Sequence, residues 1–357
     1  MRTKTGRAGR AATPAGNGAE TTVSAPQQQR MQAIVRHEYG SADVLRVEEI
    51  DRPTIRSDEV LIRVHAAGLD RGTWHFMAGM PYLFRLMGPG VRKPKNPVLG
   101  LDVAGTVAAV GADVTRFEVG DEVFGISRGS FAEYAAARED KLARKPANLT
   151  FDQAAVLPIS GLTALQSLLD VGRLKAGQHV LIVGASGGVG SYSVQIAKAS
   201  GAEVTGVCST AKVDLVRSLG ADHVLDYTRD DFATGPQRYD LILDIGGNSP
   251  LPRLRRALAP SGTLVLVGGE DGDRWTGGMG RQLQAVALSP FVPQRLTMKA
   301  PNENYADLER LARLTEAGQL TPAIDKTYPL DQAPEAMRHL QAGQARGKIV
   351  ITVAQAK

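Results

Sequence analysis

Val180-Leu181-Ile182-Val183-Gly184-Ala185-Ser186-Gly187-Gly188-Val189-Gly190 is the stretch that decides the fold of this chain. An apolar run typical of a buried strand enters a glycine-rich turn, and a helical pattern follows over Ser191–Ala199. Glycines let a backbone come close to a diphosphate, and the N–H groups at the start of a helix face the anion. We therefore expect a dinucleotide diphosphate to be held by Gly184, Ser186, Gly187, Gly188, Val189 and Gly190.

Two other kinds of glycine-rich loop do not fit this stretch. A Walker loop needs Gly-Lys-Ser/Thr, whereas Ser191 follows Gly190 here with no lysine between them. Short-chain reductases add a Tyr-x-x-x-Lys motif, and no tyrosine of this chain is followed by lysine at that spacing. A tight strand-to-helix turn without a ligand is the remaining alternative, and the alternating strands and helices around it argue against that reading.

Strands and helices alternate around this turn, which predicts an α/β fold with a doubly wound parallel sheet. The strand candidates are His179–Val183, Glu203–Val207, His223–Asp226, Asp240–Asp244, Gly262–Val267 and Arg295–Met298. Helical patterns lie between several of them, for example over Val189–Ala199 and Val213–Leu219. We expect this dinucleotide-binding domain to span residues 159–299.

Residues 31–158 and 300–357 are expected to form a second, β-rich domain. Its first part has few helical patterns, and its strand candidates are Val44–Glu48, Glu59–His65, Val103–Val110 and Glu122–Gly125. Its second part has a predicted helix, strand, helix and strand at Tyr305–Ala317, Ile324–Tyr328, Gln332–Leu340 and Lys348–Val353.

The 357 residues, 43% of them hydrophobic, are enough for two domains with sizeable cores. The formal charge of +5 comes mainly from residues 1–30, which contain five basic residues and one acidic residue. The nearly neutral remainder argues against a nucleic-acid partner. We expect residues 1–30 to be a disordered leader; an organelle-targeting presequence is the alternative, because the segment bears arginine and is poor in acids.

The single cysteine, Cys208, excludes an internal disulfide framework and the metal sites that need several thiolates. No apolar run approaches the length that spans a bilayer, and the first 30 residues lack the apolar region of a signal peptide. We therefore expect a cytoplasmic protein with no membrane partner.

The end of the second strand bears on the choice between NADPH and NADH. An NAD site places a carboxylate at the carboxyl end of that strand, whereas Glu203 lies at its start. The strand runs instead into Ser209, Thr210 and Lys212, and the stretch Val207–Lys212 has no carboxylate to repel a 2′-phosphate. Although Lys212 alone could be a solvated lysine, the whole pattern favours NADPH.

Several further stretches carry a resemblance to a known family. They include Pro97-Val98-Leu99-Gly100-Leu101-Asp102-Val103-Ala104-Gly105-Thr106-Val107, Gly120-Asp121-Glu122-Val123, Gly161-Leu162-Thr163-Ala164, Gly220-Ala221-Asp222-His223-Val224-Leu225-Asp226-Tyr227 and Arg346-Gly347-Lys348-Ile349-Val350. With the order of the domains, they make the chain resemble the medium-chain dehydrogenase/reductase superfamily, in its zinc-free quinone oxidoreductase-like branch. The resemblance implies a GroES-like β-rich catalytic domain joined to a Rossmann domain.

The same resemblance implies roles for particular residues. Thr163 would lie near the nicotinamide, and Lys212 and Tyr227 would hold the 2′-phosphate. The other positions that would line the cofactor are Gly246, Gly247, Gly268 and Lys348. Relatives pair their nucleotide domains through edge strands, so we expect a homodimer, with Arg295–Met298 as a candidate edge.

The chain departs from the zinc-containing branch of that family. That branch uses a cysteine in the first loop and a Gly-His-Glu in the core strand, where this chain has Gly68-Leu69-Asp70 and Gly100-Leu101-Asp102. Structural and catalytic zinc sites in proteins are built mostly from sulfur and nitrogen ligands. We therefore expect no zinc and no other catalytic metal.

Without a metal to stabilise an alkoxide, substrates that delocalise the incoming charge are favoured: a quinone or an α,β-unsaturated carbonyl. The walls of the substrate pocket are expected at Asp70-Arg71-Gly72-Thr73-Trp74-His75 and Met80-Pro81-Tyr82-Leu83, read as a loop. Tyr82 or His75 could donate a hydrogen bond to the developing oxyanion, or these residues and Trp74 form only an aromatic wall. Asp70 stands where relatives often carry an asparagine that contacts the cofactor.

Three functions remain open at this point. The first is a quinone or enone reductase that uses NADPH. The second is an enoyl-thioester reductase in which the basic stretch Phe84–Lys95 binds an anionic carrier, although a solvated loop or a mobile flap would explain the same residues. The third is a nucleotide-binding protein whose output is an interaction.

Overall fold

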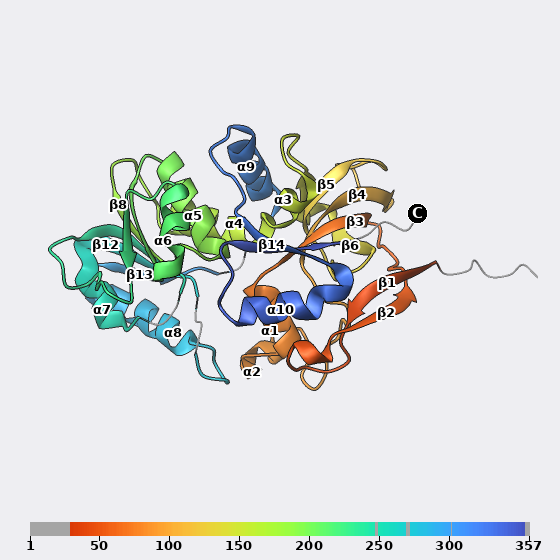
Figure 1. Ribbon diagram of the computed structural model, residues 1–357, viewed down its shortest axis with the longest axis horizontal. Coiled ribbons are helices and arrows are strands. Elements are labelled where there is room, and N and C mark those ends of the chain that lie inside the picture. The colour runs from red at the N-terminus through yellow and green to blue at the C-terminus, as the bar shows by residue number, and fades with distance from the viewer. Residues whose placement is uncertain (1–28, 247–248, 269–271, 301, 354–357) are drawn as a thin grey trace, which may run out of the picture.

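The computed structural model describes residues 29–246, 249–268, 272–300 and 302–353, which form two β-sheet units that lie side by side (Figure 1). The strands are β1 (Arg30–Val35), β2 (Arg46–Asp51), β3 (Glu59–Leu69), β4 (Asp102–Val110), β5 (Glu122–Ile126), β6 (Tyr134–Arg138), β7 (Leu142–Arg144), β8 (His179–Val183), β9 (Glu203–Cys208), β10 (His223–Asp226), β11 (Tyr239–Asp244), β12 (Leu258–Leu266), β13 (Arg295–Met298), β14 (Ile324–Pro329) and β15 (Lys348–Thr352). The helices are α1 (Arg71–Ala78), α2 (Tyr82–Leu86), α3 (Phe151–Ala155), α4 (Pro158–Leu165), α5 (Gly188–Ala199), α6 (Val213–Ser218), α7 (Leu251–Ala257), α8 (Met279–Leu288), α9 (Tyr305–Glu316) and α10 (Ala333–Gln341).

The six-stranded sheet has the order β10-β9-β8-β11-β12-β13, and all its neighbours are parallel. This confirms the predicted α/β fold with a doubly wound sheet. The chain fills one side of β8 with β9 and β10 and then returns to its other side with β11. Because the strand order reverses between β8 and β11, their carboxyl ends mark the topological switch point, where ligands of such sheets bind.

Both faces of this sheet are covered, which explains the continuous apolar run in β8. Val180 and Ile182 face the core that contains α4 and α5, whereas Leu181 faces the core beneath α7 and α8. All three side chains are fully buried. A strand that is buried on both faces has no polar alternation, as is typical of parallel sheets.

The other sheet has seven strands in the order β14-β15-β3-β4-β5-β7, and β6 also pairs with β3. Its strands β14 and β15 come from the end of the described chain: Ile349 pairs with Leu69 and Val350 with Gly68. The carboxyl-terminal segment therefore returns from the Rossmann unit to the β-rich unit. Strands β1 and β2 form a separate antiparallel pair.

Two local predictions are wrong. The strand expected at Val44–Glu48 begins later, at Arg46, because Ser41 caps a short 3-10 turn at Ala42–Val44. The stretch from Asp70 to Leu83, expected as a loop, forms α1 and the start of α2.

Within the described ranges, no helix combines the length and the apolar character that crossing a membrane requires.

Candidate functional site

The glycine-rich turn joins β8 to α5 at the carboxyl edge of the six-stranded sheet. Gly184 has a φ of +92°, which side chains with a Cβ rarely adopt, and its amide donates to the Val207 carbonyl at 3.1 Å. A Cβ on Gly190 would clash with the carbonyl oxygen of Gly184, so only glycine lets the helix approach the strand this closely. Gly188 and Val189 begin the helix, where N–H groups lack an intrahelical acceptor. The turn thus fits a diphosphate.

The middle of the turn is held by the returning carboxyl-terminal segment. Gly347 donates its amide to the Ser186 carbonyl at 3.0 Å, and Gly187 donates to the Gly184 carbonyl at 3.2 Å. Gly187 is the N-cap of α5, and no side chain among the described residues caps the helix there through a hydrogen bond. The turn is therefore fixed from both the Rossmann and the β-rich units.

A buried polar group beneath the turn joins the two units. It consists of Asp70, Asp102, Ser160 and Lys348, and we call it the junction cluster. Lys348 Nζ donates to Ser160 Oγ at 3.0 Å and lies 3.4 Å from Asp102 Oδ2. The side chains of Lys348 and Asp102 are 1% and 0% exposed. A Cβ on Gly188 would lie 2.9 Å from Lys348 Cδ, so the lysine stem packs against the start of α5.

The resemblance implied that Lys348 lines the cofactor, and the structure places this lysine directly behind the glycine-rich turn. Its ammonium points into the junction cluster because a carboxylate and a hydroxyl lie there, so it supports the turn from behind. Thr163 lies on α4, one turn after Ile159, and its hydroxyl donates to the Ile159 carbonyl at 2.7 Å. The Ile159 amide in turn donates to Asp102 Oδ1 at 2.9 Å. Through these bonds Thr163 is connected to the junction cluster.

Burial raises the pKa of Asp102 to about 8. The neighbouring Lys348 ammonium acts in the opposite direction, and the charge of Asp70 raises the pKa further. Desolvation is the dominant cause, because a carboxylate without water loses most of its hydration energy. The sequence reasoning considered Asp102 only as a failed metal ligand and therefore missed this cluster.

The expected 2′-phosphate corner lies at the ends of β9 and β10. Ser209 and Thr210 follow β9 directly, and Lys212 closes a short 3-10 turn there. Lys212 Nζ donates to the carbonyls of Gly343 and Ala345 at 2.9 and 2.8 Å. The ammonium is therefore held at this corner by the loop before β15.

Folding brings a carboxylate to this corner that the stretch Val207–Lys212 itself does not contain. Asp226, the last residue of β10, accepts a hydrogen bond from the Thr210 hydroxyl at 2.5 Å. It also accepts from the Thr228 amide and hydroxyl at 3.0 and 2.8 Å. These bonds, Thr210 first, lower the pKa of Asp226. Tyr227 follows it with a side chain that is 61% exposed.

The ends of β11 and β12 are connected by an arginine that sequence reasoning missed. Arg281 on α8 forms an ion pair with the fully buried Asp244 and donates to the carbonyls of Ser249 and Gly268 at 2.9 and 3.2 Å. Gly246 donates its amide to the Val183 carbonyl at 3.1 Å, beside the glycine-rich turn. No local pattern marks Arg281, because its partners are distant in sequence. Gly247, also expected to line the cofactor, lies outside the described residues.

The first expected wall of the substrate pocket is helical. Asp70 caps α1 by accepting from the amide and hydroxyl of Thr73 at 2.8 and 3.0 Å. Its second oxygen, Oδ2, is buried without a hydrogen-bond partner among the described residues. His75 Nδ1 donates to the Met80 carbonyl at 2.7 Å, so the neutral ring carries its proton there. The Trp74 ring lies 4.9 Å from the His75 ring and packs against the β-rich core.

Tyr82 starts α2 and contacts the Rossmann unit. Its amide donates to the Arg274 carbonyl at 2.8 Å, and the Leu83 amide donates to the Trp275 carbonyl at 3.1 Å. The rings of Tyr82 and Trp275 meet edge to face at 5.3 Å. Trp275, which sequence reasoning did not single out, is 71% exposed. Tyr82 thus lies where the two units meet, as a wall residue would.

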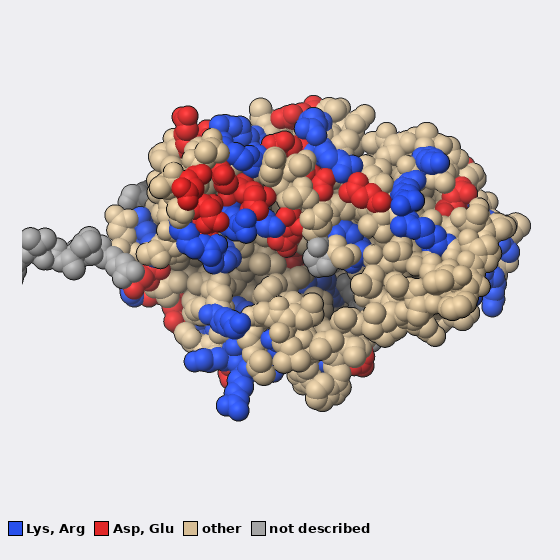
Figure 2. All heavy atoms as spheres, turned by 180° about the vertical axis from the view of Figure 1, so that it is seen from behind, with Lys and Arg blue, Asp and Glu red and all other residues tan. Residues whose placement is uncertain are grey.

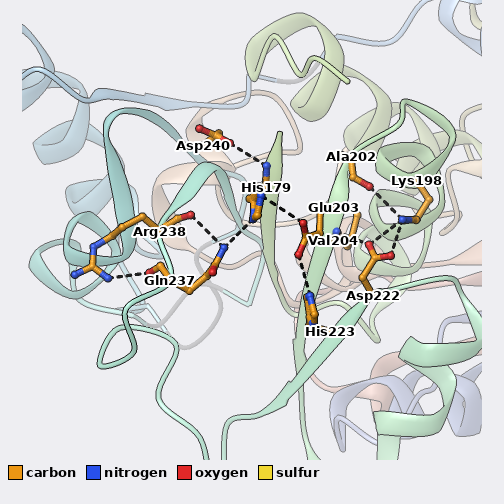
Figure 3. A network of polar contacts seen from close by, with 10 residues as sticks. All are labelled: His179, Lys198, Ala202, Glu203, Val204, Asp222, His223, Gln237, Arg238 and Asp240. Atoms are coloured by element: carbon orange, nitrogen blue, oxygen red, sulfur yellow. Dashed lines mark hydrogen bonds and ion pairs between the residues drawn. The ribbon is translucent and has the colours of Figure 1, made fainter. Parts of the chain in front are cut away.

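Glu203 lies at the opposite edge of the sheet, far from the phosphate corner. It begins β9, and its carboxylate lies 3.3 Å from His179 Nε2 and 2.9 Å from His223 Nε2 (Figure 3). His179 and His223 begin β8 and β10, so all three side chains mark the amino ends of neighbouring strands. The prediction that Glu203 lies at the wrong end to bind a ribose is confirmed.

Among the described residues, no three histidine, cysteine, aspartate or glutamate side chains are grouped in a way that could hold a metal ion. Where relatives place zinc ligands, Asp102 is already bonded to Ile159 and Lys348, and Asp70 caps a helix. These carboxylates therefore have protein partners of their own.

Comparison with known proteins connects this geometry to a family. Residues 56–147 match the family described as alcohol dehydrogenase GroES-like domain, and residues 219–351 match the one described as zinc-binding dehydrogenase. The chain is 33% identical over 348 residues to the 2-methylene-furan-3-one reductase of Solanum lycopersicum, an alignment that covers 93% of this chain and 82% of the relative.

Two solved structures have the same overall fold as this chain. The quinone oxidoreductase from Coxiella burnetii superposes with a TM-score of 0.81 at 28% identity, covering 91% of this chain and all of the other. A mycobacterial protein solved with NADPH has a TM-score of 0.76 at 29% identity and covers 90% of this chain and all of the other. The chain belongs to the medium-chain dehydrogenase/reductase superfamily, in its quinone oxidoreductase-like branch.

Proposed function

We propose that this protein is an NADPH-dependent reductase of quinones or α,β-unsaturated carbonyl compounds. The observation that carries the proposal is the turn between β8 and α5, whose glycines leave room for a diphosphate next to the switch point of the sheet. The similarity to an enone reductase and to a quinone oxidoreductase supports the substrate class.

The residues around the switch point of the sheet fit the cofactor. Gly184, Ser186, Gly187, Gly188, Val189 and Gly190 would hold the diphosphate, and Ser209, Thr210, Lys212 and Tyr227 the 2′-phosphate. Thr163, Gly246 and Gly268 would line the nicotinamide end, with Gly247 beside them in sequence. When bound, NADPH supplies a hydride to an electrophilic carbon.

The electron pair moves onto the substrate oxygen, where a proton completes the reduction. Tyr82 is the better of the two expected donors, because its hydroxyl makes no hydrogen bond to the described residues whereas His75 gives its Nδ1 proton to Met80. Trp74 and Trp275 contribute aromatic surface to this wall through their ring contacts with His75 and Tyr82. Asp70 acts by fixing the start of α1.

The reaction needs no zinc in this proposal. Asp102 and Asp70 are engaged by protein groups, and a quinone or enone spreads the incoming charge without a Lewis acid. Dialysis against a chelator should leave the turnover number unchanged; a loss that only added zinc restores would contradict this part.

The experiment that tests the function is an NADPH-oxidation assay run in parallel with 9,10-phenanthrenequinone, an alkenal and crotonyl-CoA, and repeated with NADH. We expect turnover with the quinone and the alkenal, and a lower KM for NADPH than for NADH. Turnover with crotonyl-CoA alone would favour the enoyl-thioester reductase, and tight NADPH binding without turnover would favour the sensor.

We also place the domain boundary at residues 158/159, with the β-rich catalytic domain resumed at residue 300. A homodimer through β13 and α8 belongs to the same proposal. Leu283, Val286 and Phe291 lie at this edge of the sheet and are 56%, 43% and 83% exposed.

A further inference from the structure

A compact projection follows α2, and the proposed catalytic chemistry does not use it. We define the α2 tip by the side chains of Leu86, Met87, Val91, Arg92, Lys93 and Lys95. In contrast to the sequence-based expectation of no membrane partner, we propose that the α2 tip docks this protein onto the surface of an anionic phospholipid bilayer.

The backbone of the α2 tip is held in one shape by bonds from the body of the protein. Arg85 donates to the Gly79 carbonyl at 2.7 Å, and its guanidinium lies over the Tyr39 ring at 4.4 Å. Tyr39 donates its hydroxyl to the Gly90 carbonyl at 2.7 Å. The Lys95 amide donates to the Pro89 carbonyl at 2.8 Å, which closes the turn. The tip is therefore tied to the body of the protein through Tyr39 and Gly79.

The apolar side chains of the tip face water. Leu86, Met87 and Val91 are 67%, 71% and 59% exposed, although the protein has a core that could have buried them. Three exposed apolar residues thus lie within six positions of the chain, and exposed apolar side chains that gather on a surface mark interaction sites.

The charges of the tip are all positive. Arg92, Lys93 and Lys95 are exposed, and none forms an ion pair with a described residue. Residues 71–101 contain no aspartate or glutamate. In Figure 2, lysine and arginine side chains project from the lower edge of the molecule, the edge where Figure 1 places α2. In the segment whose carbonyls accept hydrogen bonds from α2, the Asp273 carboxylate is bonded to the amides of Trp275 and Thr276.

A bilayer surface can bind both the exposed apolar side chains and the positive charges of the α2 tip. Apolar side chains enter the boundary between headgroups and acyl chains, while lysine and arginine meet anionic headgroups. A phosphate on a soluble carrier would pair with the cations and leave Leu86 and Met87 in water. A second copy of the chain, related by a two-fold axis, would place equal charges face to face.

Docking in this orientation would place the wall residue Tyr82, four residues before Leu86, near the bilayer. If the proposed function holds, an apolar quinone or enone could then pass from the lipid to the site. This consequence rests on the proposed function, whereas docking itself does not.

Vesicle flotation of the full chain tests the proposal. We expect the protein to float with vesicles of phosphatidylcholine and phosphatidylglycerol at low salt, and much less with phosphatidylcholine alone or at high salt. Two variants, Leu86→Ser/Met87→Ser and Arg92→Gln/Lys93→Gln/Lys95→Gln, should each lower the bound fraction about fivefold or more. The controls Val119→Ser, at a 66% exposed valine, and Lys175→Gln, at another exposed lysine, should not change it.

Every protein compared keeps the basic residues 1–30, so differences between variants report the tip alone. Absence of flotation, or flotation that neither tip variant reduces, overturns the proposal. The proposal is also overturned if Arg92→Gln/Lys93→Gln/Lys95→Gln changes only the KM for crotonyl-CoA. The same holds if either of the two variants changes only the oligomeric mass. Turnover of a water-soluble quinone in the same preparations tests the proposed function separately, because the tip variants should leave it intact.

Discussion

At the scale of single residues, the buried pair of Asp102 and Lys348 is the least expected feature of this protein. Two ionisable side chains without access to water are costly unless they are paired and hydrogen-bonded. Here Lys348 Nζ lies 3.4 Å from Asp102 Oδ2, and Ile159 and Ser160 supply additional bonds, but desolvation outweighs them and favours the protonated form of Asp102 up to pH about 8. The position beneath Gly188 indicates that the pair orders the start of α5.

The raised pKa of Asp102 makes a prediction about stability and pH. Between pH about 4 and about 8 the native state holds one proton more than the unfolded state, so the free energy of unfolding falls as pH rises, by up to about 1.4 kcal/mol per pH unit. This contribution is complete below the unfolded pKa and is lost as pH passes the folded pKa. Asp102→Asn should remove that slope in urea titrations across this range.

The control for that measurement is Asp214→Asn, because the side chain of Asp214 is 92% exposed. It should keep the pH slope of the parent protein. An Asp102→Asn slope equal to that of the parent would show that Asp102 is ionised in the native state.

Lys212 is the single residue from which we expect the preference for NADPH over NADH. Lys212→Glu should lower kcat/KM for NADPH about 10- to 100-fold, because it replaces a charge-assisted hydrogen bond to the 2′-phosphate with repulsion. The kcat/KM for NADH, which lacks that phosphate, should change little. Steady-state kinetics with both cofactors measure the ratio, with the exposed Lys175→Glu as control. An unchanged ratio would mean that Lys212 serves only Gly343 and Ala345.

At the scale of elements, the contact of α5 with β8 depends on two glycines. Gly190→Ala should clash with the Gly184 carbonyl, push the helix away from the strand and weaken NADPH binding at least about 10-fold. Fluorescence titration of NADPH measures this. Gly280→Ala is the matched control, since a Cβ there meets nothing within 4 Å and lies in the first turn of α8. Equal affinities for the two variants would remove the steric argument.

Helices α1 and α2 show why short elements are hard to predict. Their residues lack a long apolar period, and Gly72, Gly79 and Pro81 resemble loop residues. What stabilises α1 is the Asp70 cap at one end and Gly79, with a φ of +59°, at the other. Both signals are visible in the sequence, but the contacts to Tyr39 and Trp275 that hold the segment are not.

At the scale of the whole molecule, β13 leaves one edge of the six-stranded sheet without a partner among the described strands. Phe291 is 83% exposed beside it, and Leu283 is 56% exposed on α8. If two copies pair here, light scattering should give twice the chain mass of 37.9 kDa. Leu283→Ser/Phe291→Ser should weaken the dimer at least about 10-fold, whereas Val119→Ser should not; a monomeric parent protein would contradict the pairing.

The sequence by itself determined the alternating strands and helices, the glycine-rich turn, the parallel sheet and the family. These depend on local periodicity and on glycines whose neighbours in space are also neighbours in the chain. Only the tertiary structure decided which distant side chains meet: Asp102 with Lys348, Arg281 with Asp244, and Asp226 with Thr210. The reason is physical: such pairs are set by how strands and helices pack over separations of many residues, and no local pattern encodes that packing.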